Sequence, residues 1–347
     1  MKLLITGGAG FIGSAAVRCA VALGHEVLNV DALTYAGDLA TVSSVENSAL
    51  YRFARLDITD LSSLRHAVRD FGPDAILHFA AETHVDRSID DPTGFVQTNV
   101  VGTTNLLDAA LHFYSEISGS KKANFRFISV STDEVYGSLG SDGYFNETLP
   151  YDPSSPYSAS KAAADHMCKA WYRTYGLPVI VTNCSNNFGP YQHPEKLIPT
   201  VVQAALEGSD IPVYGTGLNV RDWLYVDDHI NAIFSILVHG QPGDTYCVGG
   251  NCEKTNLDIV SEICEILDRR FKKPSGDGFS SQIVMVQDRL GHDFRYAIDN
   301  SKLVELTGWK TSKTFLERLG ETVDWFVDHR DWLSKHEGRL GLGNKNT

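Results

Sequence analysis

Short runs of β-branched and apolar residues alternate with amphipathic segments along the first half of the chain. The runs that we expect to form strands are Leu3–Thr6, Glu26–Val30, Tyr51–Leu56, Ala75–Phe79, Phe125–Val130 and Val179–Asn183. The segments between them that have helical spacing of apolar positions include Phe11–Leu23, Leu61–Phe71 and Thr93–Tyr114. Strands that alternate with helices in this way favour an α/β fold with a doubly wound parallel sheet.

The second half of the chain is less regular. Prolines interrupt it at Pro190, Pro194, Pro199, Pro212 and Pro242. Helical spacing returns over Asn256–Phe271 and Lys313–His329. We therefore expect a first domain over residues 1–180 and a smaller lobe over most of 181–334, with some segments returning to the first domain. The lobe should cover the carboxyl ends of the strands, where open α/β sheets bind ligands. The Gly-, Lys- and Asn-rich tail over 335–347 should be frayed.

The composition is that of a soluble enzyme, with 43% hydrophobic and 21% charged residues among 347. The net charge of −13 disfavours a nucleic-acid surface. No stretch of the sequence approaches the ~20 apolar residues of a membrane span, and the start, MKLLITGGAGFIG, lacks the apolar run of a signal peptide. The six cysteines have no metal-site spacing, and most lie in apolar runs, which indicates buried thiols in a reducing compartment. We therefore expect a cytoplasmic enzyme without a metal, a membrane or a nucleic-acid partner.

A glycine-rich turn, Gly8-Ala9-Gly10-Phe11-Ile12-Gly13, follows the first predicted strand and opens the first predicted helix. Glycines there permit a tight turn and let backbone amides approach a pyrophosphate at the positive helix N-terminus. A glycine turn without a ligand is the alternative, but Asp31 closes the second strand, where a carboxylate accepts hydrogen bonds from an adenosine ribose. Because a carboxylate would repel a ribose 2′-phosphate, the pattern favours NAD over NADP. Asp57 and Ile58, after the third strand, would flank the adenine.

Tyr157 and Lys161 lie four residues apart, directly after Pro156, which favours the first turn of a helix. This spacing puts the phenol and the ammonium on one helical face. A free tyrosine titrates near ~10, but a nearby ammonium and an oxidised nicotinamide favour the phenolate. Tyr157 can then take a hydroxyl proton while hydride leaves the same carbon. An ordinary amphipathic helix is the alternative for the pair alone; together with the glycine turn and Asp31, the pair indicates hydride transfer.

Three segments resemble the extended short-chain dehydrogenase/reductase family: TGGAGFIGS near the start, HFAAETHVDRSI after the fourth strand, and YSASK. The resemblance covers nearly the whole chain. It implies a nucleotide-sugar substrate, a Rossmann domain over residues 1–180 that holds NAD tightly, and a homodimer. The cofactor-binding residues that it implies are Gly7, Gly10, Phe11, Ile12, Gly13, Asp31, Ala32, Leu33, Thr34, Asp57, Ile58, Phe79, Ala80, Ala81, Thr98, Tyr157, Lys161 and Asn187.

An adjacent acid pair, Asp133 and Glu134, follows the fifth predicted strand, at positions that usually carry uncharged residues in related epimerases. Two carboxyls in a cleft are costly unless they are used, and two solvated carboxylates in a loop are the alternative. Water loss from a sugar needs such a pair. Once C4 of a hexose is oxidised to a ketone, a base can remove the C5 hydrogen while an acid protonates the departing C6 hydroxyl. One carboxyl is then protonated and the other ionised.

Five segments together resemble the nucleotide-sugar 4,6-dehydratases of this family: STDEVYG, YSASK, SNNFGPYQHPEKLIP, RDWLYVDDH and QDRLGHDFRYAID. The resemblance implies dTDP-glucose as the substrate, Asp133 as the acid for the C6 hydroxyl and Glu134 as the base at C5. The substrate-binding residues that it implies are Thr83, Thr132, Asn186, Lys196, Leu197, Arg221, Asn256, Arg289 and His292, with Thr132 on the C4 oxygen. Thr83 replaces a serine of the family and keeps its hydroxyl, and Leu290 replaces a proline.

Other enzymes on the same scaffold are alternatives: a 4-epimerase, a UDP-glucuronate decarboxylase, or a dehydratase for a GDP-, CDP- or UDP-sugar. The acid pair argues against the first two, whereas the motifs leave the nucleotide open. A protein that senses NAD without catalysis should have lost Tyr157, Lys161 or the acid pair, and all four residues are present.

Overall fold

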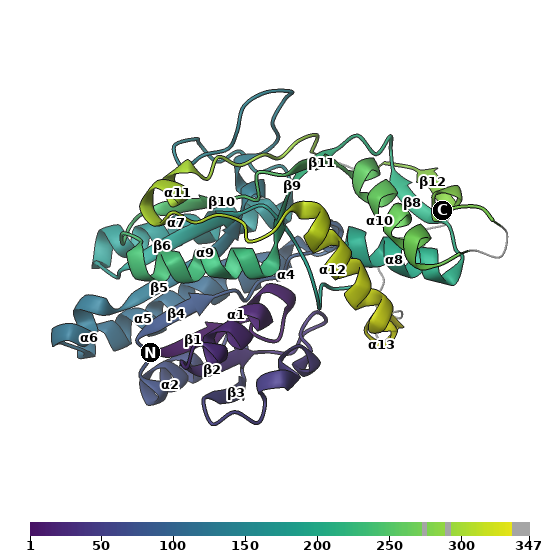
Figure 1. The fold of residues 1–347 in the computed structure, drawn as a ribbon. Coiled ribbons are helices and arrows are strands. Elements are labelled where there is room, and N and C mark those ends of the chain that lie inside the picture. Colours follow the sequence, from purple (N-terminus) through teal and green to yellow (C-terminus); the bar gives the residue numbers. More distant parts are fainter. Residues whose placement is uncertain (273–275, 289–292, 335–347) are drawn as a thin grey trace.

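The computed structural model describes residues 1–272, 276–288 and 293–334. Its central sheet contains β1 (Lys2–Thr6), β2 (Glu26–Asp31), β3 (Tyr51–Arg55), β4 (Ala75–His78), β5 (Arg126–Thr132), β6 (Val179–Cys184) and β10 (Thr245–Val248). These seven strands are all parallel and lie in the order β10-β6-β5-β4-β1-β2-β3 (Figure 1). The predicted doubly wound α/β fold is confirmed. The strand order reverses at β1, and ligands of such sheets bind at this switch point.

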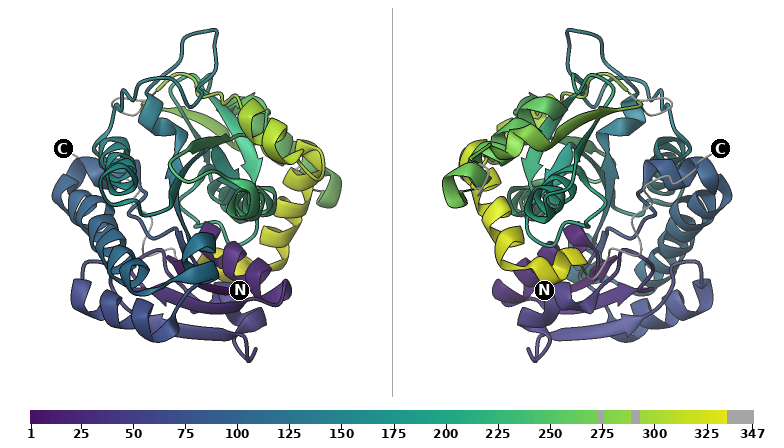
Figure 2. Two further views of the ribbon diagram at one scale, coloured as in Figure 1. Left: turned by 90° about the vertical axis from the view of Figure 1, so that its left-hand side faces the viewer. Right: turned by 90° about the vertical axis from the view of Figure 1, so that its right-hand side faces the viewer.

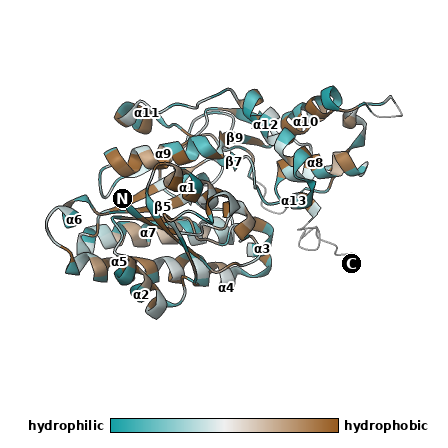
Figure 3. Cartoon of the chain, turned by 60° about the horizontal axis from the view of Figure 1, so that its bottom comes forward, coloured by the Kyte–Doolittle hydropathy of each residue, from teal (hydrophilic) through white to brown (hydrophobic). Residues whose placement is uncertain are grey.

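Helices cover both faces of the sheet, because its strands bury side chains on both sides. On one face lie α1 (Phe11–Ala22), α9 (Val226–His239) and α11 (Ser301–Thr307). On the other face lie α2 (Leu61–Phe71), α5 (Thr103–Glu116) and α7 (Pro156–Tyr175). Successive residues of β1 pack on opposite faces of the sheet. Leu3 and Ile5 belong to the hydrophobic core on the first face, and Leu4 belongs to the core on the second. Figure 3 shows hydrophobic and hydrophilic residues interleaved along α2, as expected for a helix with one buried face.

The helix predicted over Thr93–Tyr114 is divided into three parts. They are α4 (Pro92–Phe95), a π-helical stretch (Val96–Gly102) and α5. Asn99, in the π-helical stretch, is buried. Its side-chain oxygen accepts the N–H of Glu82 at 2.8 Å, and its side-chain amide donates to the hydroxyl of Ser160 at 2.9 Å. The π-helical stretch therefore connects the loop after β4 to α7.

The remaining short elements lie in the loops of the first half. They are the 3₁₀ turns Leu39–Val45 and Asp133–Tyr136, α3 (Val85–Asp90) and α6 (Gly119–Asn124). The 3₁₀ turn after β5 carries the acid pair, so the sheet places that pair directly at a strand's carboxyl end.

The second half of the chain also builds a smaller lobe with its own core. Its helices are α8 (Leu197–Glu207), α10 (Asn256–Arg270), α12 (Phe315–Asp328) and α13 (Arg330–Ser334). Its strands are β7 (Asn186–Phe188), β8 (Ile211–Tyr214), β9 (Val220–Tyr225), β11 (Glu253–Thr255) and β12 (Ile283–Val286), with a 3₁₀ turn at Phe279–Gln282. The order β11-β9-β7 forms one small sheet and β12-β8 another. Apolar residues of α8, α10 and α12 share one core.

The lobe contacts the first helix of the sheet domain through Tyr191. The guanidinium of Arg18 on α1 lies 4.8 Å from the centre of the Tyr191 ring. On the lobe side, the same ring lies 4.7 Å from Trp325 and 5.4 Å from Trp332, measured between ring centres. Figure 2 shows the corresponding course of the chain, with the yellow C-terminal helices reaching toward the purple N-terminal part.

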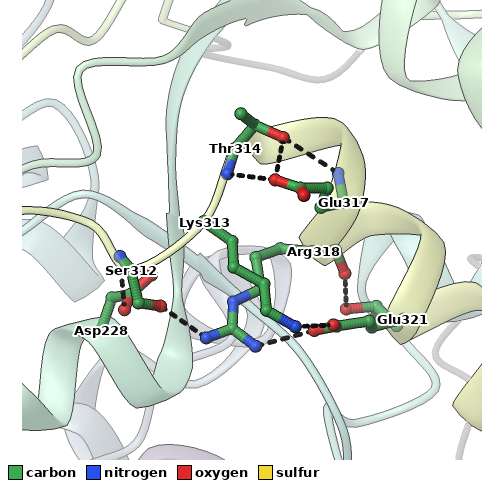
Figure 4. Close-up of polar contacts among 8 residues, drawn as sticks. Asp228, Ser312, Lys313, Thr314, Glu317, Arg318 and Glu321 are labelled. Atoms are coloured by element: carbon green, nitrogen blue, oxygen red, sulfur yellow. Dashed lines mark hydrogen bonds and ion pairs between the residues drawn. The ribbon is translucent and has the colours of Figure 1, made fainter.

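Polar contacts fix the start of α12 against α9 (Figure 4). Thr314 caps α12: its hydroxyl oxygen accepts the N–H of Glu317 at 3.4 Å, and the Glu317 carboxylate accepts the N–H of Thr314 at 2.9 Å. The carboxylate of Asp228, in the first turn of α9, accepts the N–H of Ser312 at 3.1 Å. Arg318 donates to the hydroxyl of Ser312 at 2.5 Å. These bonds hold α12, and with it α13, against the helix that covers the sheet.

Candidate active site

A cavity of about 510 Å³ lies at the carboxyl ends of the central strands, lined by both the sheet loops and the lobe. The predicted cofactor residues that line it are Gly7, Gly10, Phe11, Ile12, Gly13, Asp31, Ala32, Thr34, Asp57, Ile58, Phe79, Ala80, Ala81, Thr98, Tyr157, Lys161 and Asn187. The predicted substrate residues that line it are Thr83, Thr132, Asn186, Lys196, Leu197, Arg221 and Asn256. Arg289 and His292 lie outside the described residues. Residues that the sequence scatters over the chain thus meet in one cavity.

The glycine-rich turn lets two backbone segments approach each other at the start of α1. Gly7 has a φ of +70°, and a Cβ atom there would lie 2.6 Å from the backbone nitrogen of Ala80. Gly10 is the N-cap residue of α1, and the first turn of that helix carries no acidic side chain. The N-terminal amides of α1 therefore present a partial positive charge at this end of the cavity. The geometry fits a pyrophosphate group.

Asp31 ends β2 beside the glycine-rich turn. Its carboxylate accepts the N–H of Ala9 at 2.9 Å and the N–H of Leu33 at 2.8 Å. Burial raises the pKa of Asp31, and these two backbone bonds act in the opposite direction. Leu33 is the one described cofactor residue of the prediction that does not line the cavity. It adopts a left-handed conformation, with a φ of 55°, and contributes its backbone to the turn that holds Asp31.

The acid pair differs in burial between its two members. Thr132 caps the turn after β5: its hydroxyl oxygen accepts the N–H of Glu134 at 3.3 Å and donates its proton to Asp133 at 3.3 Å. Asp133 is only 2% exposed, and its Oδ2 atom has no hydrogen-bond partner among the described residues. Burial raises the pKa of Asp133 well above its ordinary value, and the charges of Glu134 and Asp222 raise it further. Glu134 is half-buried. The turn therefore presents a buried carboxyl with a raised pKa beside a more exposed carboxyl.

Tyr157 and Lys161 lie in the first two turns of α7, which Ser155 caps. The ammonium of Lys161 donates to the carbonyl of Val130 at 2.9 Å. Burial raises the pKa of Tyr157 well above its ordinary value, and the charge of Glu134 adds to this effect. Burial lowers the pKa of Lys161. The protein environment thus favours the phenol form of Tyr157, so that a phenolate there requires added positive charge.

The lobe contributes polar groups that are suited to a charged ligand. Arg221 of β9 lies on the cavity wall, with its guanidinium 4.3 Å from the centre of the Tyr296 ring and one NH₂ group donating to the carbonyl of Asp293 at 3.0 Å. Asn186 of β7 also lines the cavity, and its buried Oδ1 atom has no hydrogen-bond partner among the described residues. Buried polar atoms in folded proteins almost always have a partner, so this atom marks a place where a ligand or water completes the bonding.

The site also contains a polar cluster centred on Glu195, which was not predicted from the sequence. The hydroxyl of Tyr35 donates to Glu195 at 3.4 Å, and His84 and His193 each bring a ring nitrogen to 3.5 Å from the other carboxylate oxygen. His84, His193 and Glu195 line the cavity. The cluster joins the loops after β2 and β4 to the lobe. Tyr35 and His84 are far in sequence from His193 and Glu195, so no spacing connects the cluster.

Within residues 1–272, 276–288 and 293–334, no group of three His, Cys, Asp or Glu side chains is arranged so that it could hold a metal ion. Nor does that part of the chain contain a helix with the length and apolar character needed to cross a membrane.

Comparison with known proteins agrees with the geometry of the site. The family model described as GDP-mannose 4,6 dehydratase matches residues 4–322. A probable dTDP-glucose 4,6-dehydratase from Sinorhizobium fredii is 53% identical over 345 residues, which are 99% of this chain and 98% of the relative. A dTDP-glucose 4,6-dehydratase from Neisseria meningitidis is 50% identical over 352 residues and 99% of each chain.

Solved structures show the same relationship. A dTDP-glucose 4,6-dehydratase from Streptomyces venezuelae, solved with NAD bound, superimposes with a TM-score of 0.88 at 42% identity, over 96% of this chain and 99% of the other. A UDP-glucose 4-epimerase from Thermus thermophilus, also in complex with NAD, reaches a TM-score of 0.83 at 29% identity, over 95% and 100% of the two chains. The chain therefore belongs to the family of the GDP-mannose 4,6 dehydratase model and, within it, to the group of the dTDP-glucose 4,6-dehydratases, as its motifs predicted.

Proposed function

We propose that this chain converts dTDP-glucose to dTDP-4-keto-6-deoxyglucose, with NAD reduced and reoxidised in every turnover. The observation that carries the proposal is the buried Asp133 beside the half-buried Glu134, in the same cavity as Tyr157 and Lys161. Burial raises the pKa of Asp133, which suits an acid. A hydride-transfer enzyme that only inverts or oxidises its substrate has no use for an additional acid and base. The loss of water needs both.

Tyr157 accepts the proton of the C4 hydroxyl as hydride leaves C4. The Thr132 hydroxyl, which donates to Asp133 in the free protein, donates instead to the C4 oxygen when the sugar is bound. Bound NAD supplies the hydride acceptor and later the hydride donor. Because burial raises the pKa of Tyr157, the phenolate depends on positive charge from the Lys161 ammonium and the oxidised nicotinamide. Lys161 lies one helical turn from Tyr157 and can supply that charge directly.

Glu134 then removes the proton at C5, which the C4 ketone has made acidic. Asp133 gives its proton to the C6 hydroxyl, the C5–H and C6–O bonds break, and water leaves. Hydride returns to C6, a proton returns to C5, and the C4 ketone remains in the product. The raised pKa of the buried Asp133 suits the acid, and the more exposed Glu134 takes the role of the base.

The residues that hold the ligands complete this proposal. The amides at the start of α1 fit the pyrophosphate of NAD, and Asp31 fits the adenosine ribose. Arg221 and Lys196 supply positive charge for the nucleotide diphosphate of the sugar. The further residues assigned to the sugar nucleotide are Thr83, Asn186, Leu197 and Asn256, which line the cavity, and Arg289 and His292.

We also propose that the protein forms a homodimer and that it resides in the cytoplasm. Three apolar side chains are exposed on α3 and the π-helical stretch, namely Ile89, Val96 and Val101, and a partner that covers them would remove apolar surface from water. Light scattering on the purified protein tests the dimer.

The cytoplasmic location is supported by the cysteines. All six are free thiols, which suits a reducing compartment.

A panel of dTDP-, UDP-, GDP- and CDP-glucose, assayed without added NAD, tests the function. We expect keto-sugar to form from dTDP-glucose in many turnovers, because the cofactor is regenerated in the site. The other sugars should react at least about tenfold more slowly, since one lost base contact costs about 1.4 kcal/mol or more. Preference for another nucleotide would contradict the substrate, and dependence on added NAD in amounts equal to product would contradict the internal return of hydride.

A further inference from the structure

Asp165 is a fully buried carboxyl group that the proposed reaction leaves without a role. It lies on α7 four residues after Lys161, which itself lies four residues after Tyr157. Residues with this spacing share a helical face, so the three side chains form a row that runs from the cavity into the core. Along the helix axis, Asp165 lies about 6 Å from Lys161 and about 12 Å from Tyr157. A buried carboxyl is costly unless its hydrogen bonds and its charge are used.

Two neutral donors converge on one oxygen of Asp165. The hydroxyl of Tyr151 donates to Oδ2 at 3.0 Å, and the side-chain amide of Asn183 donates to the same atom at 3.1 Å. That amide also donates to the carbonyl oxygen of Thr132 at 3.1 Å, while the Asn183 side-chain oxygen accepts the hydroxyl proton of Tyr136 at 3.3 Å. Asn183 therefore couples the carboxylate of Asp165 to the backbone of the segment that carries the acid pair.

Lys161 is the cation that faces Asp165. Lys161 is 6% exposed. Burial lowers the pKa of its ammonium, and the charge of Asp165 is the largest charge contribution that raises that pKa again. The other titratable groups whose charge acts on Lys161 are the thiols of Cys168 and Cys184. Burial raises the pKa of the thiols of Cys168 and Cys184 to about 12, and it lowers the pKa of the His78 imidazole to about 3. Burial also raises the pKa of Asp165, and the charge of Lys161 and the hydrogen bonds from Asn183 and Tyr151 act in the opposite direction. An ionised Asp165 is then the anion that compensates the buried ammonium.

We infer that Asp165 is a positioning residue for hydride transfer, which keeps Lys161 in its ammonium form and, through Asn183, holds the Thr132 carbonyl in place. The inference rests on the proposed function, because there the charge of Lys161 favours the phenolate of Tyr157. Asp165 needs no contact with the substrate for this role. With a neutral residue at position 165, the buried ammonium would lack its anion and would give up its proton more easily.

The variant Asp165→Asn removes the charge and keeps most of the shape. In single turnovers, the rate at which dTDP-glucose reduces the bound cofactor should rise with pH in the parent protein, as Tyr157 loses its proton. Loss of Asp165 lowers the pKa of Lys161, and a neutral Lys161 no longer lowers that of Tyr157. The rise should therefore move to higher pH by about one unit, with a rate about tenfold lower at neutral pH. The direct repulsion between Asp165 and a phenolate acts the other way, but over twice the distance.

Two further variants separate positioning from simple structural support. Asp165→Glu keeps the charge, and Tyr151→Phe removes one hydrogen bond without changing any charge. Both should lower the unfolding temperature and leave the pH profile of cofactor reduction near that of the parent. If Asp165→Asn also lowered only the unfolding temperature and left the pH profile unchanged, the inference would be overturned.

A measurement on the parent protein tests the charge state of Lys161 even if Asp165→Asn does not fold. NMR of isotopically labelled lysine side chains, with the signal of Lys161 assigned from Lys161→Arg, should show an ammonium group at neutral pH in the NAD-bound protein. A neutral amine there would contradict the inference. If the parent protein itself fails to reduce its cofactor with dTDP-glucose, the proposed function fails, and the lysine signal still tests the pairing with Asp165.

Discussion

In the Asp133→Asn and Glu134→Gln variants, we expect dTDP-glucose to reduce the bound cofactor while release of the 4-keto-6-deoxy sugar slows by about 10²–10⁴-fold. Burial raises the pKa of Asp133 and so favours its neutral form, and asparagine keeps the charge of that form while it removes the proton that the C6 hydroxyl needs. Glutamine at position 134 removes the base at C5. The absorbance of the reduced cofactor and chromatography of the sugar measure the two steps separately.

The Glu134→Gln variant has a second expected effect, on the pH dependence of cofactor reduction. Among the charged groups, Glu134 raises the pKa of Tyr157 most, so its removal should lower that pKa and extend cofactor reduction to lower pH. A matched control is Asp142→Asn, which removes one carboxylate from an exposed loop position and should behave like the parent. Normal turnover by both acid-pair variants would show that the pair does not carry out the elimination.

For Tyr157→Phe, we expect cofactor reduction to slow about a thousandfold, equivalent to about 4 kcal/mol of activation free energy, with NAD still bound. The Tyr157 ring lies edge-on to Phe95 with 6.3 Å between the ring centres, and phenylalanine preserves that packing. The variant therefore loses the hydroxyl without leaving a cavity. Rapid mixing with dTDP-glucose measures the rate. Tyr175→Phe, on the same helix but 54% exposed, is the matched control. A parent-like rate in Tyr157→Phe would mean that another group takes the C4 proton.

The fold was largely predictable because its strands and helices are locally encoded. Each of the six predicted strands ends within two residues of the observed one. In the central sheet, the strand β10 was missed, since its four residues, Thr245–Val248, are too few to show a period. The break in the helix over Thr93–Tyr114 was also missed. It depends on Asn99, whose bonds to Glu82 and Ser160 form only after distant segments have packed together.

The difference between local signals and contacts made only after folding also explains which parts of the candidate site could be predicted. The glycine-rich turn and the acid pair directly follow a strand, and Asp31 is the last residue of one. Parallel strands bring their carboxyl ends together at one edge. Asp165 and Glu195 carry no local signal. Asp165 reads as an ordinary helical carboxyl in the sequence, and only the folded chain shows it buried against Asn183 and Tyr151. For the other assigned residues, lining the cavity supports a role in binding, and those roles stay predictions.

The central claim is that Glu134 removes the C5 proton while the sugar is held as a C4 ketone. The measurement that tests it most directly is turnover of dTDP-glucose in deuterated water, followed by NMR of the product. We expect one solvent deuteron at C5, because the proton that Glu134 removes is replaced from water. At C6, we expect the hydrogen that was carried there from C4. A product with its original hydrogen at C5 would contradict the elimination.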